Sequence, residues 1–109
     1  MRYLRRISMD NYINLPKEVR KKHDIRPGDS YVEIPCGKGA VCFSREDKWT
    51  TSIEITTHKI TKSGSIRLTK HQLKALDSRY GHRVFIEMLS EGDILIQSDQ
   101  GGAYDSVQK

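Results

Sequence analysis

The strongest constraint on the fold is that the chain repeats itself. The segment Ile7–Lys17 aligns with the segment Ile60–Lys70 at an offset of 53 residues, which places Ile13 on Ile66. Self-similarity at a fixed period predicts that one supersecondary unit is built twice. The 109 residues leave about 45 for each copy. Because so short a copy cannot cover its own apolar strand faces, we expect the two copies to share one core.

Each copy has the pattern of a small β unit with one short helix. A first strand is followed by a polar turn and a second strand, expected at 12–15 and 65–68. Pro16 suits the first turn of a helix, and Thr69 offers a side-chain oxygen as an N-cap. Turns at Gly28 and Gly81 follow each helix. A closing hairpin then completes each copy, with strands predicted at 31–35 and 40–44, and at 84–89 and 93–97.

These signals divide the chain into a first repeat at 1–45, a linker at 46–56, a second repeat at 57–98 and a flexible tail at 99–109. The alternation at 53–55 predicts that part of the linker is extended. The fold class is mostly β with two short helices. The predicted core is the apolar set of the strands: Ile7, Ile13, Leu15, Val32, Ile34, Val41, Phe43, Ile60, Ile66, Leu68, Val84, Ile86, Ile94 and Ile96.

The positive charge falls in the same half of each copy. Residues 5–26 carry seven Lys and Arg against three Asp and Glu, and residues 58–83 carry seven against one. The hairpin segments 27–57 and 84–109 are net negative. If the copies pack about a pseudo-twofold axis, their basic halves can combine into one face. Such a face suits a run of DNA phosphates. The alternative interpretation, an ordinary solvated helix rich in Lys and Arg, does not explain why the charge recurs in both copies.

The motif from Ile13 to Arg20 (INLPKEVR), followed by Ile25–Asp29 (IRPGD), resembles the DNA-binding signature of the AbrB/MazE/SpoVT swapped-hairpin family. In the second copy, Ile60–Leu68 resembles the opening strand, turn and strand of that family. The resemblance implies two tandem AbrB-like swapped-hairpin repeats that interlock into one pseudo-twofold β-barrel, in the tandem arrangement of MraZ-like regulators. It implies a sequence-specific transcriptional regulator that binds double-stranded DNA.

Carried over residue by residue, the resemblance places the DNA contacts on the end of the first strand, the turn after it, and the helix. Strand alternation adds Asn14 and Arg67, which flank inward-facing residues. We expect Arg20 to contact a guanine or a phosphate, and the lysines to contact phosphates. The full predicted set is Arg5, Arg6, Asn11, Tyr12, Asn14, Lys17, Arg20, Lys21, His58, Lys59, Lys62, Ser65, Arg67, Lys70 and Lys74.

Other functional classes are weakly supported. The four histidines are scattered and no Gly-rich phosphate loop is present, so we expect no enzyme, metal or cofactor. Cys36 and Cys42 match no zinc or redox spacing and are predicted to be small core or hairpin residues. No apolar run approaches the roughly 20 residues of a membrane span, and Arg2, Arg5 and Arg6 precede no signal-peptide stretch. We therefore expect a cytoplasmic, nucleoid-associated protein.

Two alternatives stay open. A MazE-like antitoxin would bind DNA with the same fold and a toxin through its tail, where Tyr104 and Val107 are the main apolar anchors. A non-DNA scaffold that binds a protein partner is the other.

The linker is long enough for the repeats to interlock within one chain, and it equally permits a domain-swapped homodimer or a higher oligomer.

Overall fold

The computed structural model describes residues 2–46 and 57–99. The predicted extended segment at 53–55, and nearly all of the predicted linker and tail, lie outside the described residues. The elements are β1 (Arg2–Arg6), the 3-10 turn η1 (Met9–Asn11), β2 (Tyr12–Asn14), α1 (Lys17–Lys22), β3 (Ser30–Ile34), β4 (Ala40–Arg45), β5 (Thr57–Lys59), β6 (Ser65–Arg67), α2 (Lys70–Ala75), β7 (Arg83–Met88) and β8 (Ile94–Ser98). The prediction of a mostly β fold with two short helices is confirmed.

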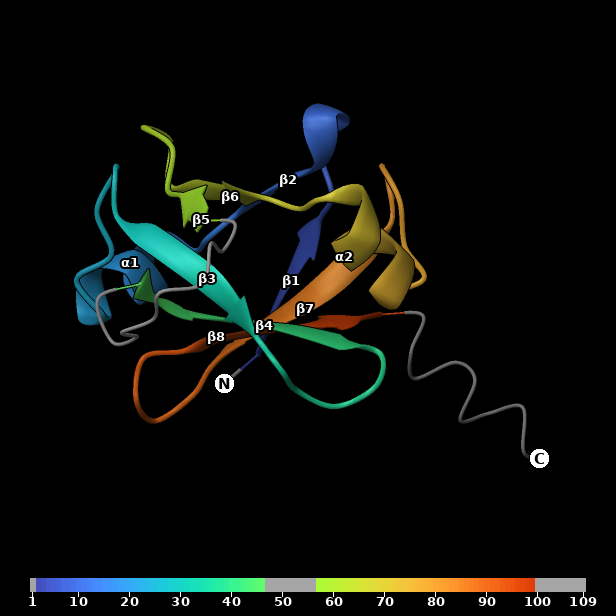
Figure 1. The fold of residues 1–109 in the computed structure, drawn as a ribbon. Coiled ribbons are helices and arrows are strands. Elements are labelled where there is room, and N and C mark those ends of the chain that lie inside the picture. Colours follow the sequence, from blue (N-terminus) through green and yellow to red (C-terminus); the bar gives the residue numbers. More distant parts are fainter. Residues whose placement is uncertain (1, 47–56, 100–109) are drawn as a thin grey trace.

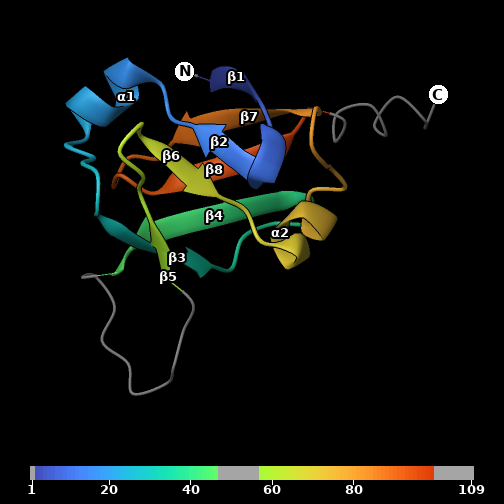
Figure 2. The same cartoon turned by 90° about the horizontal axis from the view of Figure 1, so that it is seen from above.

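The strands form two antiparallel sheets that mix the two halves of the chain. The larger sheet has the order β1-β7-β8-β4-β3-β5, and β2 pairs with β6 in a two-stranded ribbon. The ribbon lies above the larger sheet, with α1 and α2 near its opposite ends (Figures 1 and 2). The β3–β4 and β7–β8 hairpin loops project from the other side of the molecule (Figure 1).

The pairing between the two repeats is reciprocal. The first strand of each repeat pairs with the third strand of the other: β1 pairs with β7, and β5 pairs with β3. Two other pairs join positions that are 53 residues apart in the sequence, Ile13 with Ile66 and Cys42 with Leu95. Equivalent positions of the repeat therefore face one another at the centre of the ribbon and at the centre of the larger sheet.

The predicted closed barrel is not confirmed. The six-stranded sheet has two edges, β1 and β5, and the β2–β6 ribbon is a separate sheet. Backbone hydrogen bonds do continue beyond the β1–β7 and β5–β3 pairs at equivalent places, on the segments that lead toward the ribbon. The amide of Ile7 donates to the carbonyl of His82 (2.8 Å), and the amide of Ile60 donates to that of Asp29 (2.9 Å).

Both helices are one and a half turns long and start where the sequence indicates. Pro16 is the N-cap residue of α1. Thr69 caps α2 through a capping box, in which its hydroxyl accepts from the Gln72 amide and the Gln72 side chain accepts from the Thr69 amide. A residue with positive φ follows each helix two positions after its end, Asp24 (53°) and Asp77 (50°), and Gly28 and Gly81 (both 90°) then turn the chain into the next strand.

The predicted core is largely correct, with one difference in β3. The aliphatic residues of β2, β6 and β8, such as Ile13, Ile66 and Ile96, are fully buried. In β3, however, Tyr31 enters the main core cluster and Ile34 is only half-buried. Tyr31 aligns with Val84 of the second repeat at the offset of 53 residues, and both side chains are fully buried in this cluster. Val32 is buried as predicted, but it does not belong to that cluster.

The shared core predicts that both repeats unfold together. Replacing Ile66 by Ala should cost roughly 2 to 5 kcal/mol, because the cavity would open where the two repeats meet. Equilibrium urea unfolding monitored by circular dichroism should show one transition that moves to lower urea as a whole. Met9→Ala is the control, since Met9 is 69% exposed and should change stability by less than about 0.5 kcal/mol. Two transitions, only one of which responds to Ile66→Ala, would contradict this description.

Candidate nucleic-acid interface

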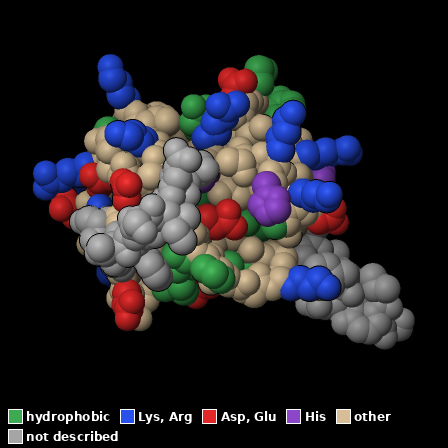
Figure 3. All heavy atoms as spheres, viewed as in Figure 1, with side chains coloured by type: hydrophobic (Ala, Val, Ile, Leu, Met, Phe, Trp, Pro, Cys, Tyr) green, Lys and Arg blue, Asp and Glu red, His purple; other side chains and the backbone are tan. Residues whose placement is uncertain are grey.

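The two basic segments of the chain lie on the same side of the molecule. β2 and β6 run side by side, and the chain passes from each of them directly into a helix, α1 or α2. Figure 3 shows Lys and Arg side chains along the edge of the molecule that carries this ribbon in Figure 1, and beside α2. We call the surface formed by β2, β6, their turns and the two helices the ribbon face.

Six lysines of the predicted set are exposed. They lie on α1, α2, β5 and the turn before β6, and in the described part of the chain none of them forms an ion pair. Exposed ammonium groups without a carboxylate partner keep their full attraction for a polyanion. The six are Lys17, Lys21, Lys59, Lys62, Lys70 and Lys74.

The side chain of Asn14 on β2 forms hydrogen bonds to β6 and to the turn that precedes it. Its Nδ2 donates to the backbone carbonyl of Ser63 (2.9 Å) and to the hydroxyl of Ser65 (3.1 Å). The Ser65 side chain is buried at 7% exposure, and the Ser65 amide donates to the hydroxyl of Thr61 (3.0 Å). Asn14 stays exposed, whereas Ser65 serves to hold the turn and offers little surface to a ligand.

Arg20 reaches from α1 across the turn that precedes β6. Its Nε donates to the carbonyl of Leu15 (3.1 Å), and its side chain lies directly over Gly64. A Cβ placed on Gly64 would come within 2.5 Å of the Cδ, Nε and Cζ atoms of Arg20. A Cβ at this position would therefore displace the Arg20 side chain, and the φ of +81° independently favours glycine. The guanidinium is thereby held at the ribbon face.

Arg67 occupies the strand position equivalent to Asn14, and its contacts differ. Its Nε donates to the carbonyl of Asp10 (3.2 Å), and its guanidinium carbon lies 5.9 Å from the centre of the Tyr12 ring. Asp10 and Asn11 both have positive φ, so the η1 turn presents the Asp10 carbonyl to Arg67.

At the edge strand β1, Arg6 donates to the carbonyl of Gly81 (2.7 Å), while Arg5 is half-buried and donates to that of Leu4 (3.0 Å).

The sequence predicts that His58 contacts DNA, but in the structure its side chain is buried and bonds to other residues of the protein. It is 7% exposed, and its ring meets the Phe43 ring edge-on with centres 4.9 Å apart. Its Nδ1 lies 2.9 Å from the Arg67 carbonyl, which can only accept, so Nδ1 donates and Nε2 accepts from Gln72 (3.2 Å). Adjacent strand residues face opposite sides, so His58 points inward where Lys59 points outward.

Gln72 is the residue of this region that the sequence analysis missed. It is 2% exposed, caps α2 and donates from Nε2 to Glu33 as well as to His58. The pattern Thr69-x-x-Gln72 is a capping-box signature and could have identified it. Through these contacts Gln72 ties α2 to β5 and fixes the first turn of that helix, from which Lys70 projects.

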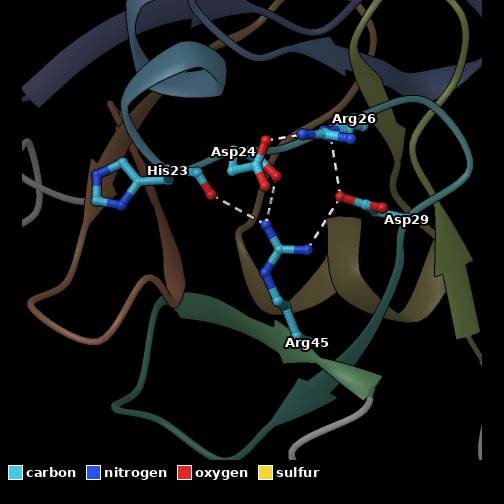
Figure 4. Close-up of polar contacts among 5 residues, drawn as sticks. All are labelled: His23, Asp24, Arg26, Asp29 and Arg45. Carbon is cyan, nitrogen blue, oxygen red and sulfur yellow. Dashed lines mark hydrogen bonds and ion pairs between the residues drawn. The ribbon is translucent and has the colours of Figure 1, made fainter.

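A second fixed contact, centred on Arg45 of β4, holds the end of α1 (Figure 4). Its Nη2 donates to the carbonyls of His23 (3.0 Å) and Asp24 (2.9 Å), and its Nη1 donates to the Asp29 carboxylate (2.9 Å). Burial opposes ionisation of Asp29. The hydrogen bonds from the Arg26 amide and Arg45, with the charges of both arginines, outweigh burial and lower the pKa of Asp29. The helix that carries Arg20 is thus anchored to the larger sheet.

The cysteines lie where the sequence indicates, in the β3–β4 hairpin. Cys36 is exposed in the loop and Cys42 is buried in β4. Burial, reinforced by the neighbouring Cys36, raises the pKa of the Cys42 thiol to about 11. Burial also raises the pKa of Cys36. Both thiols are therefore protonated near neutral pH, the form that is the weaker nucleophile and metal ligand.

Within 2–46 and 57–99, no group of three or more His, Cys, Asp or Glu side chains could hold a metal ion. No helix in these ranges has the length and apolar character needed to cross a membrane.

No protein-family model matches this chain, and no curated protein matches it. The resemblance to the AbrB/MazE/SpoVT family therefore rests on the motifs of the sequence alone.

The packing of Arg20 on Gly64 predicts an unequal cost for two glycine substitutions. Gly64→Ala and Gly92→Ala both place Ala at a positive φ, which costs roughly 1 to 2 kcal/mol each. Only Gly64→Ala also displaces Arg20, since a Cβ on Gly92 meets nothing within 4 Å. Chemical denaturation should show Gly64→Ala to be the more damaging by about 1 kcal/mol. That excess should vanish in an Arg20→Ala background, and equal costs in both backgrounds would disprove the contact.

Proposed function

We propose that this chain binds double-stranded DNA through the ribbon face and acts as a sequence-specific transcriptional regulator of the AbrB/SpoVT type. The observation that carries the proposal is the reciprocal pairing of the repeats. Because β2 pairs with β6, the strand, turn and helix of one basic segment lie next to those of the other. A sequence in which the same half of each copy is basic thereby acquires one extended cationic surface.

In the finer form of this proposal, the ribbon and the larger sheet together make one pseudo-twofold barrel from two AbrB-like repeats. The equivalent hydrogen bonds of Ile7 and Ile60, and the facing pairs at Ile13–Ile66 and Cys42–Leu95, support it. A single chain then supplies what would otherwise need two subunits. The acidic hairpins lie away from the ribbon face and would not oppose a polyanion there.

The residues take different roles under this proposal. The six exposed lysines neutralise phosphates and contribute to affinity for any sequence. Arg20, fixed over Gly64 with its Nη atoms beyond the bond to Leu15, is suited to a bidentate contact with guanine. Arg67, Asn14 and Asn11 lie between the two helices, on the strands and turn that a DNA groove would meet. His58 and Ser65 support this surface from beneath and are not among the proposed contacts.

The proposal predicts that charge removal weakens DNA binding only on the ribbon face. Lys21→Ala and Lys74→Ala, at equivalent positions of α1 and α2, should each weaken binding to every duplex about two- to fivefold. The matched control is Lys38→Ala, which removes an exposed lysine from the opposite β3–β4 loop and should leave binding unchanged. Fluorescence anisotropy with labelled genomic duplexes, including DNA that flanks the protein's own gene, provides the measurement.

Arg20→Ala is the specificity arm of the same experiment. It should cost roughly 1 to 3 kcal/mol on the preferred duplex and relax the preference at one base pair. If the folded protein binds no duplex at about 50 mM salt, or if Lys38→Ala weakens binding as much as Lys21→Ala, the proposed function is wrong.

A further inference from the structure

A pocket of about 370 Å³ opens at one end of the ribbon face, between β5, β6 and the start of α2. This volume falls within the range of small-molecule sites, roughly 300 to 1,000 Å³. The pocket is bounded by residues of both repeats, since the η1 turn and β2 contribute one wall. The lining includes Tyr12, His58, Lys59, Arg67, Thr69 and Lys70.

The ionisable side chains that line the pocket favour an anion. Lys59, Arg67 and Lys70 come from three different elements and are all exposed. Among the residues that the structure describes, no carboxylate lines the pocket, and Arg67 contacts the carbonyl of Asp10, not its carboxylate. Three cations that line one concave site match the charge and the oxygen atoms of a phosphate group.

An aromatic ring lies beside these cations. Tyr12 is half-buried and forms part of the pocket wall, with the Arg67 guanidinium carbon 5.9 Å from its ring centre. Aromatic rings and guanidinium planes are the surfaces on which nucleic-acid bases stack. A phosphate site next to such a surface has the composition of a nucleotide site.

The walls of the pocket are held by bonds that do not depend on a ligand. The Arg67 side chain is fixed by the Asp10 carbonyl, and the Arg67 carbonyl accepts from His58. The capping box of Thr69 and Gln72 fixes the chain from which Lys70 projects. A site organised in advance loses less conformational entropy when it binds.

The other repeat lacks two of the four side chains of this site at equivalent positions. Offset by 53 residues, Lys17 corresponds to Lys70 and Arg6 to Lys59, but Asn14 corresponds to Arg67 and Ser65 to Tyr12. The first repeat therefore keeps two of the cations, without the third cation and without the ring. This difference supplies a matched internal control for the site.

We propose that this pocket binds a nucleoside phosphate, with the phosphate at Lys59, Arg67 and Lys70 and the base against Tyr12. The nucleotide is either free in solution or a unit of a DNA strand, and only the second source rests on the proposed function. Three solvent-screened charge contacts and one stacked ring correspond to a Kd of about 0.1 to 1 mM for a mononucleotide.

The test is a titration of the full chain with 5′-AMP, followed by NMR chemical shifts or calorimetry in the absence of DNA. We expect saturable binding that Lys70→Ala weakens about fivefold and that Lys17→Ala leaves unchanged. Inorganic phosphate should bind at least about fivefold more weakly than 5′-AMP, because it cannot stack on Tyr12. A duplex that 5′-AMP displaces identifies a DNA unit as an occupant, whereas binding without displacement identifies the free nucleotide.

The proposal is overturned if the folded wild-type protein shows no saturable binding of 5′-AMP, if Lys17→Ala and Lys70→Ala weaken it equally, or if inorganic phosphate binds as tightly. Failure of the DNA-binding proposal gives a different result. In that case 5′-AMP still binds, while anisotropy detects no duplex binding by the same protein.

Discussion

The rest of this structure depends on the antiparallel pairing of each repeat's first strand with the other repeat. The register is the same in both cases: Arg5 pairs with Val84 and, 53 residues on, His58 pairs with Tyr31. Backbone amides and carbonyls that enter the interior must find partners. Here the partners of one repeat lie largely in the other. Neither repeat can therefore satisfy its own strands, and the basic strand–turn–helix segments are brought together as a consequence.

Much of this arrangement could be predicted from the sequence because it depends on local signals. Thr69 begins a helix, and the isoleucines at 13 and 66 are buried, because capping and apolar alternation act over a few residues. The inward position of Tyr31 does not follow from the local alternation of Val32 and Ile34, which places Tyr31 on the other face; only its alignment with Val84 in the second repeat indicates it. His58 shows the same limit. Its place within the motif indicated a DNA contact, but strand alternation and the partners Gln72 and Arg67 turn it inward.

The two halves of the ribbon face also differ more than the repeat suggests. In the half that contains α1, the Arg20 side chain lies across Gly64. In the half that contains α2, the position equivalent to Arg20 is Leu73, which is buried, and Arg67 instead turns toward Tyr12 beside an open pocket. A duplicated sequence thus retains one backbone plan while its two halves acquire different chemistry. Under the proposed DNA-binding function, both halves contribute to affinity and base selection is concentrated in the half that contains Arg20.

The salt dependence of duplex binding tests most directly whether both halves act as one DNA-binding surface. Each neutralised phosphate contributes a slope of about −0.9 to log K against log[salt]. About six contacts, spread over the two basic segments, predict a slope near −5 for the wild-type protein. A flat response would contradict DNA binding through the ribbon face. A slope of only about −2 to −3 would show that one basic segment binds alone and would contradict the joint surface.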